Sequence, residues 1–347
     1  MRKALVTGGA GFIGSHLVEK LLGENWEVTV VDNFDPFYDP SVKIRNVAAC
    51  RKHAAFQFLN ADIRDADLSR RLGSGRFDAV VHLAGKAGVR PSIEDPLSYQ
   101  DVNVRGTQQI LELCRTLEIP RCIFASSSSV YGVNPDVPWH EETAVLQPIS
   151  PYASTKISGE LMGHVYSHLY GIRFIALRFF TVYGPRQRPD LAIHKFIHRI
   201  TQGLPLPLFG DGKSMRDYTY IDDIVAGIRA AMEYSASPYE IFNLGCGEPI
   251  RLIDMVRTIS EVSTIPVRIE SLPEQAGDVP QTYASIDKAS RMLGYKPRVT
   301  FREGIQRFME WYNGQEIAHV RGITGIAPPP SAVGDTSLPA TKYRASL

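Results

Sequence analysis

The chain alternates short, continuous apolar runs with longer stretches whose apolar residues recur at helical spacing. The runs predict strands at residues 3–7, 27–31, 56–59, 79–83, 122–126, 174–180 and 240–244. The first five are apolar at successive positions, as expected for parallel strands covered on both faces. Between the first two, Ile13, Leu17 and Leu21 mark one face of a helix. This alternation predicts a doubly wound parallel α/β (Rossmann) sheet with right-handed crossovers.

The pattern changes after residue 180, where proline and glycine become frequent. The length of 347 residues also favours about two domains. We expect a dinucleotide-binding domain at residues 1–180 plus about 222–245. A smaller α/β substrate domain would take residues 181–221 plus 246–315. Residues 316–347 are rich in Ala, Pro, Ser and Thr and predict a flexible tail.

A glycine-rich turn follows the first predicted strand. Gly8 permits a tight turn, Gly11 lets the backbone approach a pyrophosphate, and Gly14 lets helix and strand pack closely. Asp32 ends the second strand, where a carboxylate accepts hydrogen bonds from ribose hydroxyls and repels a 2′-phosphate. The pattern favours NAD over NADP. A purely structural glycine turn is the alternative, because the spacing is GxxGxxG rather than GxGxxG.

Other residues are expected to line the same dinucleotide site, several of them in loops that follow the third and fourth strands. They are Phe12, Ile13, Asn33, Asp62, Ile63, Leu83, Ala84, Gly85, Lys86, Asn103 and Phe179, together with Tyr152 and Lys156.

Tyr152 and Lys156 form a YxxxK pair at the start of a predicted helix, which Ser150 and Pro151 open. Residues four apart share one helical face. Ser127 lies in a serine run at the carboxyl end of the fifth strand, where open α/β sheets bind ligands. A free phenol titrates near 10, so a general base needs the pKa of Tyr152 lowered by the lysine and by a nicotinamide. Ser127 would relay the proton or hold the reacting oxygen. The alternative is a surface tyrosine beside a serine-rich turn.

Composition narrows the class of protein. Lys plus Arg number 38 and Asp plus Glu 37, so the charge gives no reason to expect nucleic acid or an acidic membrane as partner. No apolar run reaches the roughly 18 residues of a membrane helix. The four cysteines lack CxxC spacing, so neither a zinc site nor a disulfide framework is predicted. Two histidine pairs, at 164/168 and 194/198, have zinc-like spacing but no evident third ligand, and we expect no metal. A cytoplasmic enzyme is expected.

Four motifs together resemble the extended short-chain dehydrogenase/reductases that act on nucleotide sugars, over about residues 1–312. They are GGAGFIG at 8–14, SSSSVYG at 126–132, YASTK at 152–156 and RDYTYIDD at 216–223. Within that group the chain is most similar to UDP-glucuronate 4-epimerases. The segments that point there are VDNF at 31–34, FYDP at 37–40, AGVR at 87–90, RFFTVYGP at 178–185, RPD at 188–190 and QAGDV at 275–279.

The resemblance implies transient oxidation at C4 of a UDP-sugar. Tyr152 would take the 4-OH proton while hydride passes to tightly held NAD, and the 4-keto sugar would turn over and recover hydride on its other face. Ser127 matches the family's serine or threonine partner. Homodimers are implied as well, through helices at residues 101–117 and 152–170.

Several positions bear on substrate choice. Ser128 and Ser129 are neutral where related dehydratases and decarboxylases have acidic residues, and Thr181 and Gln275 replace an asparagine and an arginine of UDP-glucose 4-epimerases. These departures favour a uronic acid such as UDP-glucuronate. The expected substrate contacts are Ser127, Ser128, Tyr152, Thr181 and Arg188 (with Arg90 or Arg186 as alternatives to Arg188), and Arg216 and Asp278 for the nucleotide.

Three alternatives remain at this stage. The first is the same chemistry on UDP-glucose or UDP-N-acetylglucosamine. The less favoured ones are a UDP-glucuronate decarboxylase and a non-catalytic NAD-binding protein.

Overall fold

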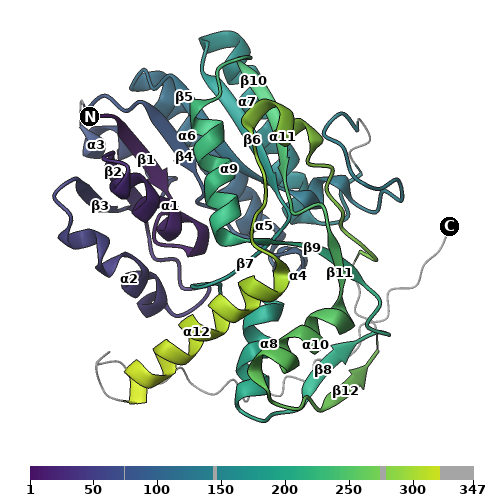
Figure 1. Cartoon of the computed structure of the whole chain (residues 1–347). Helices are drawn as coiled ribbons and strands as arrows, with labels where there is room; N and C mark the ends of the chain where they lie inside the picture. The colour runs from purple at the N-terminus through teal and green to yellow at the C-terminus, as the bar shows by residue number, and fades with distance from the viewer. Residues whose placement is uncertain (74, 144–146, 274–278, 321–347) are drawn as a thin grey trace.

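A seven-stranded parallel sheet forms the centre of the molecule (Figure 1). The computed structural model describes residues 1–73, 75–143, 147–273 and 279–320, with side chains up to residue 315. In spatial order the strands are β10 (Tyr239–Leu244), β6 (Arg173–Phe179), β5 (Arg121–Ser127), β4 (Ala79–His82), β1 (Lys3–Thr7), β2 (Glu27–Asp32) and β3 (Phe56–Asn60). All seven predicted strands are present, with ends within one residue of those expected.

Helices cover both faces of this sheet, which explains the continuous apolar runs. On β1, Val6 belongs to one apolar core and its neighbour Leu5 to the other. The first core includes residues of α1 (Phe12–Gly23) and α9 (Ile221–Glu233). The second includes residues of α3 (Leu68–Leu72), α6 (Gly106–Thr116) and α7 (Pro151–Tyr170). The predicted doubly wound α/β fold is confirmed.

The strand order reverses between β1 and β4. The chain runs outward from β1 through β2 to β3, then returns to β4 on the other side of β1. The crevice at the carboxyl ends of the strands beside such a switch point is where open α/β sheets bind ligands. The strand order therefore predicts a ligand site at the loops after β1 and β4.

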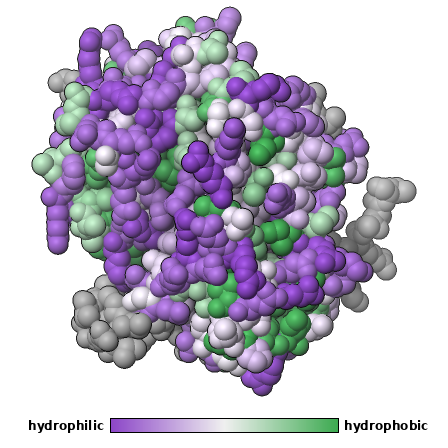
Figure 2. All heavy atoms as spheres, in the orientation of Figure 1, coloured by the Kyte–Doolittle hydropathy of each residue, from purple (hydrophilic) through white to green (hydrophobic). Residues whose placement is uncertain are grey.

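Smaller elements form a second region that extends from the centre of Figure 1 to its lower right. Its sheets are β11 (Pro249–Arg251), β9 (Met215–Tyr220) and β7 (Thr181–Tyr183), and the pair β12 (Ile269–Leu272) and β8 (Leu206–Phe209). Its helices include α8 (Ala192–Thr201) and α10 (Leu252–Ser263). The face drawn in Figure 2 is largely hydrophilic, and apolar side chains gather mainly over this region. The exact division into two domains stays a prediction.

The remaining elements are short, except for the last helix. They are α2 (Pro40–Ala48), η1 (Cys50–Lys52), α4 (Val89–Glu94), α5 (Pro96–Tyr99), η2 (Gln100–Arg105), η3 (Ser128–Tyr131), α11 (Asp287–Leu293) and α12 (Phe301–Val320). The expected tail begins at residue 316, and the structure continues α12 to Val320. The rest of the expected tail, 321–347, lies outside the described residues.

No helix in the described part of the chain combines the length and apolar character that crossing a membrane requires. Within the same residues, no group of three or more His, Cys, Asp or Glu side chains is placed to hold a metal ion.

Candidate active site

The glycine turn after β1 is built for close backbone approach. Gly8 has φ +70°, in the left-handed region that favours glycine, and a Cβ there would lie 2.7 Å from the backbone nitrogen of Ala84. A Cβ on Gly14 would lie 2.2 Å from the carbonyl oxygen of Gly8. The amide of Gly11 donates to that same oxygen at 3.1 Å. The turn thus brings bare backbone and the start of α1 to the sheet edge, which suits a pyrophosphate.

A cavity of about 420 Å³ opens at this edge and extends past the ends of β2, β3, β4 and β5. Every residue predicted for the dinucleotide lines it, apart from Asn103. Asn103 is buried behind the lining: its amide oxygen accepts from the backbone of Lys86 at 2.8 Å, and its amide nitrogen donates to Lys86 O and to Thr155 Oγ1. Asn103 therefore holds the loop after β4 in place.

The carboxylate of Asp32 is fixed at the end of β2. One oxygen accepts from the backbone amide of Ala10, in the glycine turn, at 3.1 Å, and the other accepts from the amide of Phe34 at 2.9 Å. The side chain is buried and lines the cavity. These contacts place an oriented acceptor beside the glycine turn, as ribose recognition requires.

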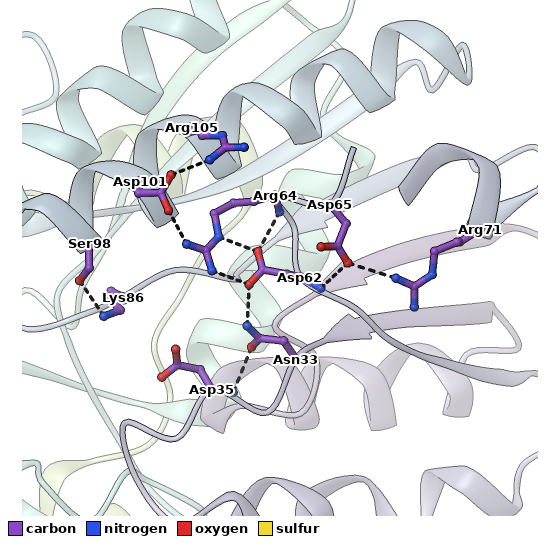
Figure 3. A network of polar contacts seen from close by, with 10 residues as sticks. All are labelled: Asn33, Asp35, Asp62, Arg64, Asp65, Arg71, Lys86, Ser98, Asp101 and Arg105. Carbon is purple, nitrogen blue, oxygen red and sulfur yellow. Dashed lines mark hydrogen bonds and ion pairs between the residues drawn. The ribbon is translucent and has the colours of Figure 1, made fainter. Parts of the chain in front are cut away.

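A polar network borders the same cavity beyond Asp32 (Figure 3). The side-chain amide of Asn33 donates to Asp62 at 2.8 Å. Arg64 donates two hydrogen bonds to the same carboxylate, from Nε at 2.8 Å and from Nη2 at 2.7 Å. Arg64 also pairs with Asp101, which pairs with Arg105. Hydrogen bonds from Arg64 hold the pKa of Asp62 below its ordinary value. Sequence reasoning found Asn33 and Asp62 but missed Arg64, Asp101 and Arg105.

The predicted catalytic residues converge on one side of the cavity. Helix α7 begins as expected: Ser150 caps it by accepting from the amide of Ala153 at 3.2 Å, and Pro151 is its first residue. Tyr152 and Lys156 follow one turn apart, and both line the cavity with Ser127 at the end of β5. The Lys156 ammonium donates to the carbonyl of Ala125 at 2.8 Å.

Burial has the largest effect on the pKa values of Tyr152 and Lys156 in the protein by itself. Burial raises the pKa of Tyr152, whereas a hydrogen bond with Ser127 and the charge of Arg188 lower it, and the net shift is upward. The expected lowering of the Tyr152 pKa by Lys156 together with a nicotinamide stays a prediction. Burial also lowers the pKa of Lys156 to about 8, against an opposing effect of Glu160.

An ion pair lies beneath the catalytic residues. Glu160, one turn beyond Lys156, accepts from Arg178 of β6 at 2.9 and 2.8 Å, and both side chains are almost fully buried. Ser126, next to Ser127, donates to the same carboxylate. The pair therefore joins α7, β5 and β6 directly behind the site, and sequence reasoning missed it.

The expected substrate contacts are only partly brought together. Thr181 and Arg188 line the cavity. Arg188 forms two hydrogen bonds to Asp190, at 2.9 and 2.6 Å, and its guanidinium lies 4.9 Å from the ring centre of Phe37.

Other expected contacts lie elsewhere. Ser128, Arg90 and Arg216 are not among the lining residues, and Arg186 instead pairs with Glu19 on α1 at 2.6 Å. Asp278 and Gln275 lie outside the described residues.

The lining includes aromatic residues that the sequence did not single out for this role. Tyr99 packs edge-on against Tyr152, with ring centres 6.3 Å apart, and donates to Ala87 O at 3.2 Å. Tyr38 and Phe37 border the cavity near Arg188. Phe37 and Tyr38 belong to the FYDP motif at 37–40, which could have pointed to them. No motif marks Tyr99.

These features fit a dinucleotide. The bare glycine turn, the fixed Asp32 carboxylate and the apolar lining from Ile13, Ile63 and Leu83 would hold its diphosphate, ribose and adenine. Lys156 and Tyr152 border the other end of the same cavity.

Comparisons with known proteins agree with this geometry. Residues 4–245 match the NAD dependent epimerase/dehydratase family. A probable UDP-glucuronate 4-epimerase of Rhizobium meliloti is 39% identical over 89% of this chain and 96% of that protein. The crystal structure of a UDP-glucuronic acid 4-epimerase from Bacillus cereus, in complex with UDP-glucuronic acid and NAD, superposes with a TM-score of 0.85 at 38% identity. The superposition covers 90% of this chain and 99% of the Bacillus cereus chain.

A UDP-glucose 4-epimerase from Thermotoga maritima, with UDP-glucose, is nearly as similar in structure. Its TM-score is 0.84 at 33% identity, again over 90% of this chain and 99% of that one. The resemblance inferred from the motifs is confirmed, and NAD is the family's cofactor. The chain belongs to the NAD-dependent epimerase/dehydratase family.

Proposed function

We propose that the protein is an NAD-dependent UDP-sugar 4-epimerase, an isomerase, that interconverts UDP-glucuronate and UDP-galacturonate. The observation that carries the proposal is the meeting of Tyr152, Ser127 and Lys156 at one cavity with the glycine turn and with Thr181 and Arg188.

Tyr152 acts as the base that removes the 4-OH proton. Burial raises the pKa of its phenol, so cationic groups must favour the phenolate at the moment of reaction. Arg188 already contributes in this direction, and Ser127 hydrogen bonds to the phenol. Bound NAD supplies a positively charged ring that accepts and returns the hydride of C4. Lys156, anchored on Ala125, keeps a third positive charge at the same end of the cavity.

The uronate imposes a second task on the protein. A 4-keto uronic acid is a β-keto acid, which loses carbon dioxide when its C5–carboxylate bond stands perpendicular to the carbonyl plane. The site must therefore hold the carboxylate in another orientation. Thr181 offers a hydroxyl, and Arg188 offers N–H donors in a guanidinium that Asp190 and Phe37 hold in place.

One observation favours the rival substrate class. The Asp190 carboxylate is bound to two nitrogens of Arg188 and offsets much of its charge. A neutral hexose would need no such cation, and the Thermotoga maritima relative is named a UDP-glucose 4-epimerase. The rival is thus a UDP-glucose or UDP-N-acetylglucosamine 4-epimerase. Ser128 and Ser129 have no acidic side chain, which argues against a dehydratase or a decarboxylase.

The deciding experiment is incubation of the purified protein, without added NAD, with UDP-glucuronate and separately with UDP-glucose. Products are read by NMR. UDP-galacturonate formation with little turnover of UDP-glucose supports the proposal. Turnover of UDP-glucose alone selects the rival, and release of carbon dioxide identifies a decarboxylase.

We also propose that the protein is a homodimer that pairs through α7. Leu161, Val165 and Leu169 recur every four residues on this helix and are 59%, 48% and 61% exposed. Neighbouring Tyr170 is 49% exposed. An exposed apolar stripe of this kind is typical of a helix that packs against a second helix.

A further inference from the structure

An ion pair ties the loop after β3 to the turn that precedes α6. Arg64, in that loop, bonds to Asp62 through Nε and Nη2 and to Asp101 through Nη1 (Figure 3). Asp101 belongs to η2, and the two aspartates lie on opposite sides of the guanidinium. Of this group Asp62 lines the cavity, while Arg64 and Asp101 stand behind it. Arg64 therefore acts on the cavity through Asp62.

The same loop is also fixed by an apolar contact. A Cβ on Gly106, the residue after η2, would lie 2.5 Å from the Cδ1 atom of Ile63. The Ile63 side chain therefore packs directly on the backbone at the start of α6. Asp62 and Ile63 both line the cavity, so their positions depend on this junction.

The turn η2 reaches a second cavity loop as well. It is a π-helical turn at Gln100–Arg105, a widened geometry that often occurs at functional sites. Within it, Asp101 contacts Arg64, and Asn103 holds the backbone of Lys86 in the loop after β4. One turn thus anchors the loops that follow two different strands of the sheet.

We propose that Arg64 and Asp101 are positioning residues that slow the release of NAD, by pinning the Asp62–Ile63 loop against the dinucleotide cavity. The need for such a device rests on the proposed function, because an epimerase returns the hydride to the same sugar and must keep its cofactor between the two transfers. The claim concerns cofactor retention alone, so it is tested without any sugar substrate.

The chain offers matched controls for this test. Arg70 follows the same loop, on α3, and pairs with Asp67 at 2.8 Å. It does not line the cavity. Arg105 pairs with Asp101 at 3.1 Å but does not reach the loop after β3. Loss of either control arginine removes a surface ion pair of similar kind and leaves the Arg64–Asp101 connection intact.

The experiment measures how fast full-length holoenzyme releases NAD. Alcohol dehydrogenase and ethanol convert each released NAD to NADH, which is followed at 340 nm. A single partly exposed ion pair is worth little, but Arg64 combines a bidentate bond to Asp62 with a pair to Asp101. We therefore expect release to be about fivefold faster in Arg64→Met and about threefold faster in Asp101→Ala, which loses fewer of these bonds. The double variant should release no faster than Arg64→Met. Arg70→Met and Arg105→Met, which each lose one exposed ion pair, should stay within about twofold of the wild type.

Release at the wild-type rate in Arg64→Met overturns the proposal, as does an equal acceleration in Arg70→Met. Arg64→Lys guards against a general loss of structure, because it keeps the charge but not the two-pronged grip on Asp62, and its rate should fall between those of wild type and Arg64→Met. If the proposed function fails but this inference holds, the wild type does not epimerise a UDP-sugar, while the variants still release NAD at the rates expected above.

Discussion

The ammonium group of Lys156 donates a hydrogen bond to the backbone carbonyl of Ala125 at 2.8 Å. Ala125 precedes Ser126 and Ser127, so this bond fixes α7 against the end of β5, where the serine of the site lies. The ammonium lies 5.7 Å from the centre of the Tyr152 ring. Lys156 therefore acts first as an anchor, and its charge reaches Tyr152 from a distance.

The protonation of Lys156 should limit activity at alkaline pH. Because its pKa is lowered to about 8, the ammonium is lost as pH rises through that value, and kcat/KM should fall with it. The titratable and charged groups around Lys156 are Glu160 and Tyr152 on α7, His82 on β4, and Arg178 behind Glu160.

Replacing Glu160 tests this assignment. Glu160 raises the pKa of Lys156, so Glu160→Gln should move the alkaline limb of kcat/KM about one pH unit lower. Glu160→Asp should keep the limb near its wild-type position, and Glu310→Gln, at an exposed site, should leave it unchanged. A lower rate at every pH, with no shift of the limb, would mean that Glu160 is only structural.

His82 should make stability depend on pH. It is fully buried between the hydroxyls of Thr7 and Thr107, and burial lowers its pKa from 6.5 to about 3. The folded protein thus resists protonation that the unfolded chain accepts, so this contribution is present above about 6.5 and is lost as pH falls toward 3. The loss is about 1.4 kcal/mol per pH unit in that window.

Urea unfolding at pH 7 and pH 4.5 measures this effect. The free energy of unfolding of the wild type should fall by about 2–3 kcal/mol more than that of His82→Gln between these values. An identical pH dependence in both proteins would show that His82 does not carry it.

The apolar stripe on α7 should determine the oligomeric state. Leu161→Glu combined with Leu169→Glu places charges in the proposed interface and should give a monomer by size-exclusion chromatography with light scattering. Leu204→Glu, which replaces a leucine that is 45% exposed elsewhere, should leave the dimer intact. A wild-type protein that is already monomeric would rule out the proposed pairing.

Arg188 should separate the two substrate classes. If it orients the uronate carboxylate, Arg188→Met should lower kcat/KM for UDP-glucuronate by about 100-fold or more, since charge-assisted contacts in a closed site are worth several kcal/mol. Any turnover of UDP-glucose should fall much less, because only the effect of Arg188 on the Tyr152 phenol is then lost. Arg186→Met removes an arginine that pairs with Glu19 instead and should change the value only slightly. Equal small losses in both variants would argue for a neutral sugar.

Local signals accounted for much of the fold and the site. The central strands were readable because each is a continuous apolar run, and the start of α7 because Ser150 and Pro151 are a cap and a first helical residue. The short strands β7 and β9 were missed. They lie in a stretch interrupted by glycine and proline, and their pairing depends on partners distant in the sequence.

The sequence also did not predict which polar side chains pair with one another in the folded protein. Arg64 and Asp101 are 37 positions apart, and nothing local marks them as partners. Arg188 and Asp190 lie two positions apart in the RPD motif, yet only the structure shows the guanidinium bonded to the carboxylate. The upward pKa shift of Tyr152 was equally hidden, because it arises mainly from burial, which depends on the completed fold.

The most direct test of the account is the rate of UDP-sugar epimerisation by Tyr152→Phe, measured by NMR alongside the NAD bound to the purified variant. Removal of a general base typically costs 10²–10⁴-fold. The account predicts a loss of about 10³-fold or more with the NAD content unchanged. A variant that retains its NAD and epimerises at close to the wild-type rate would contradict it.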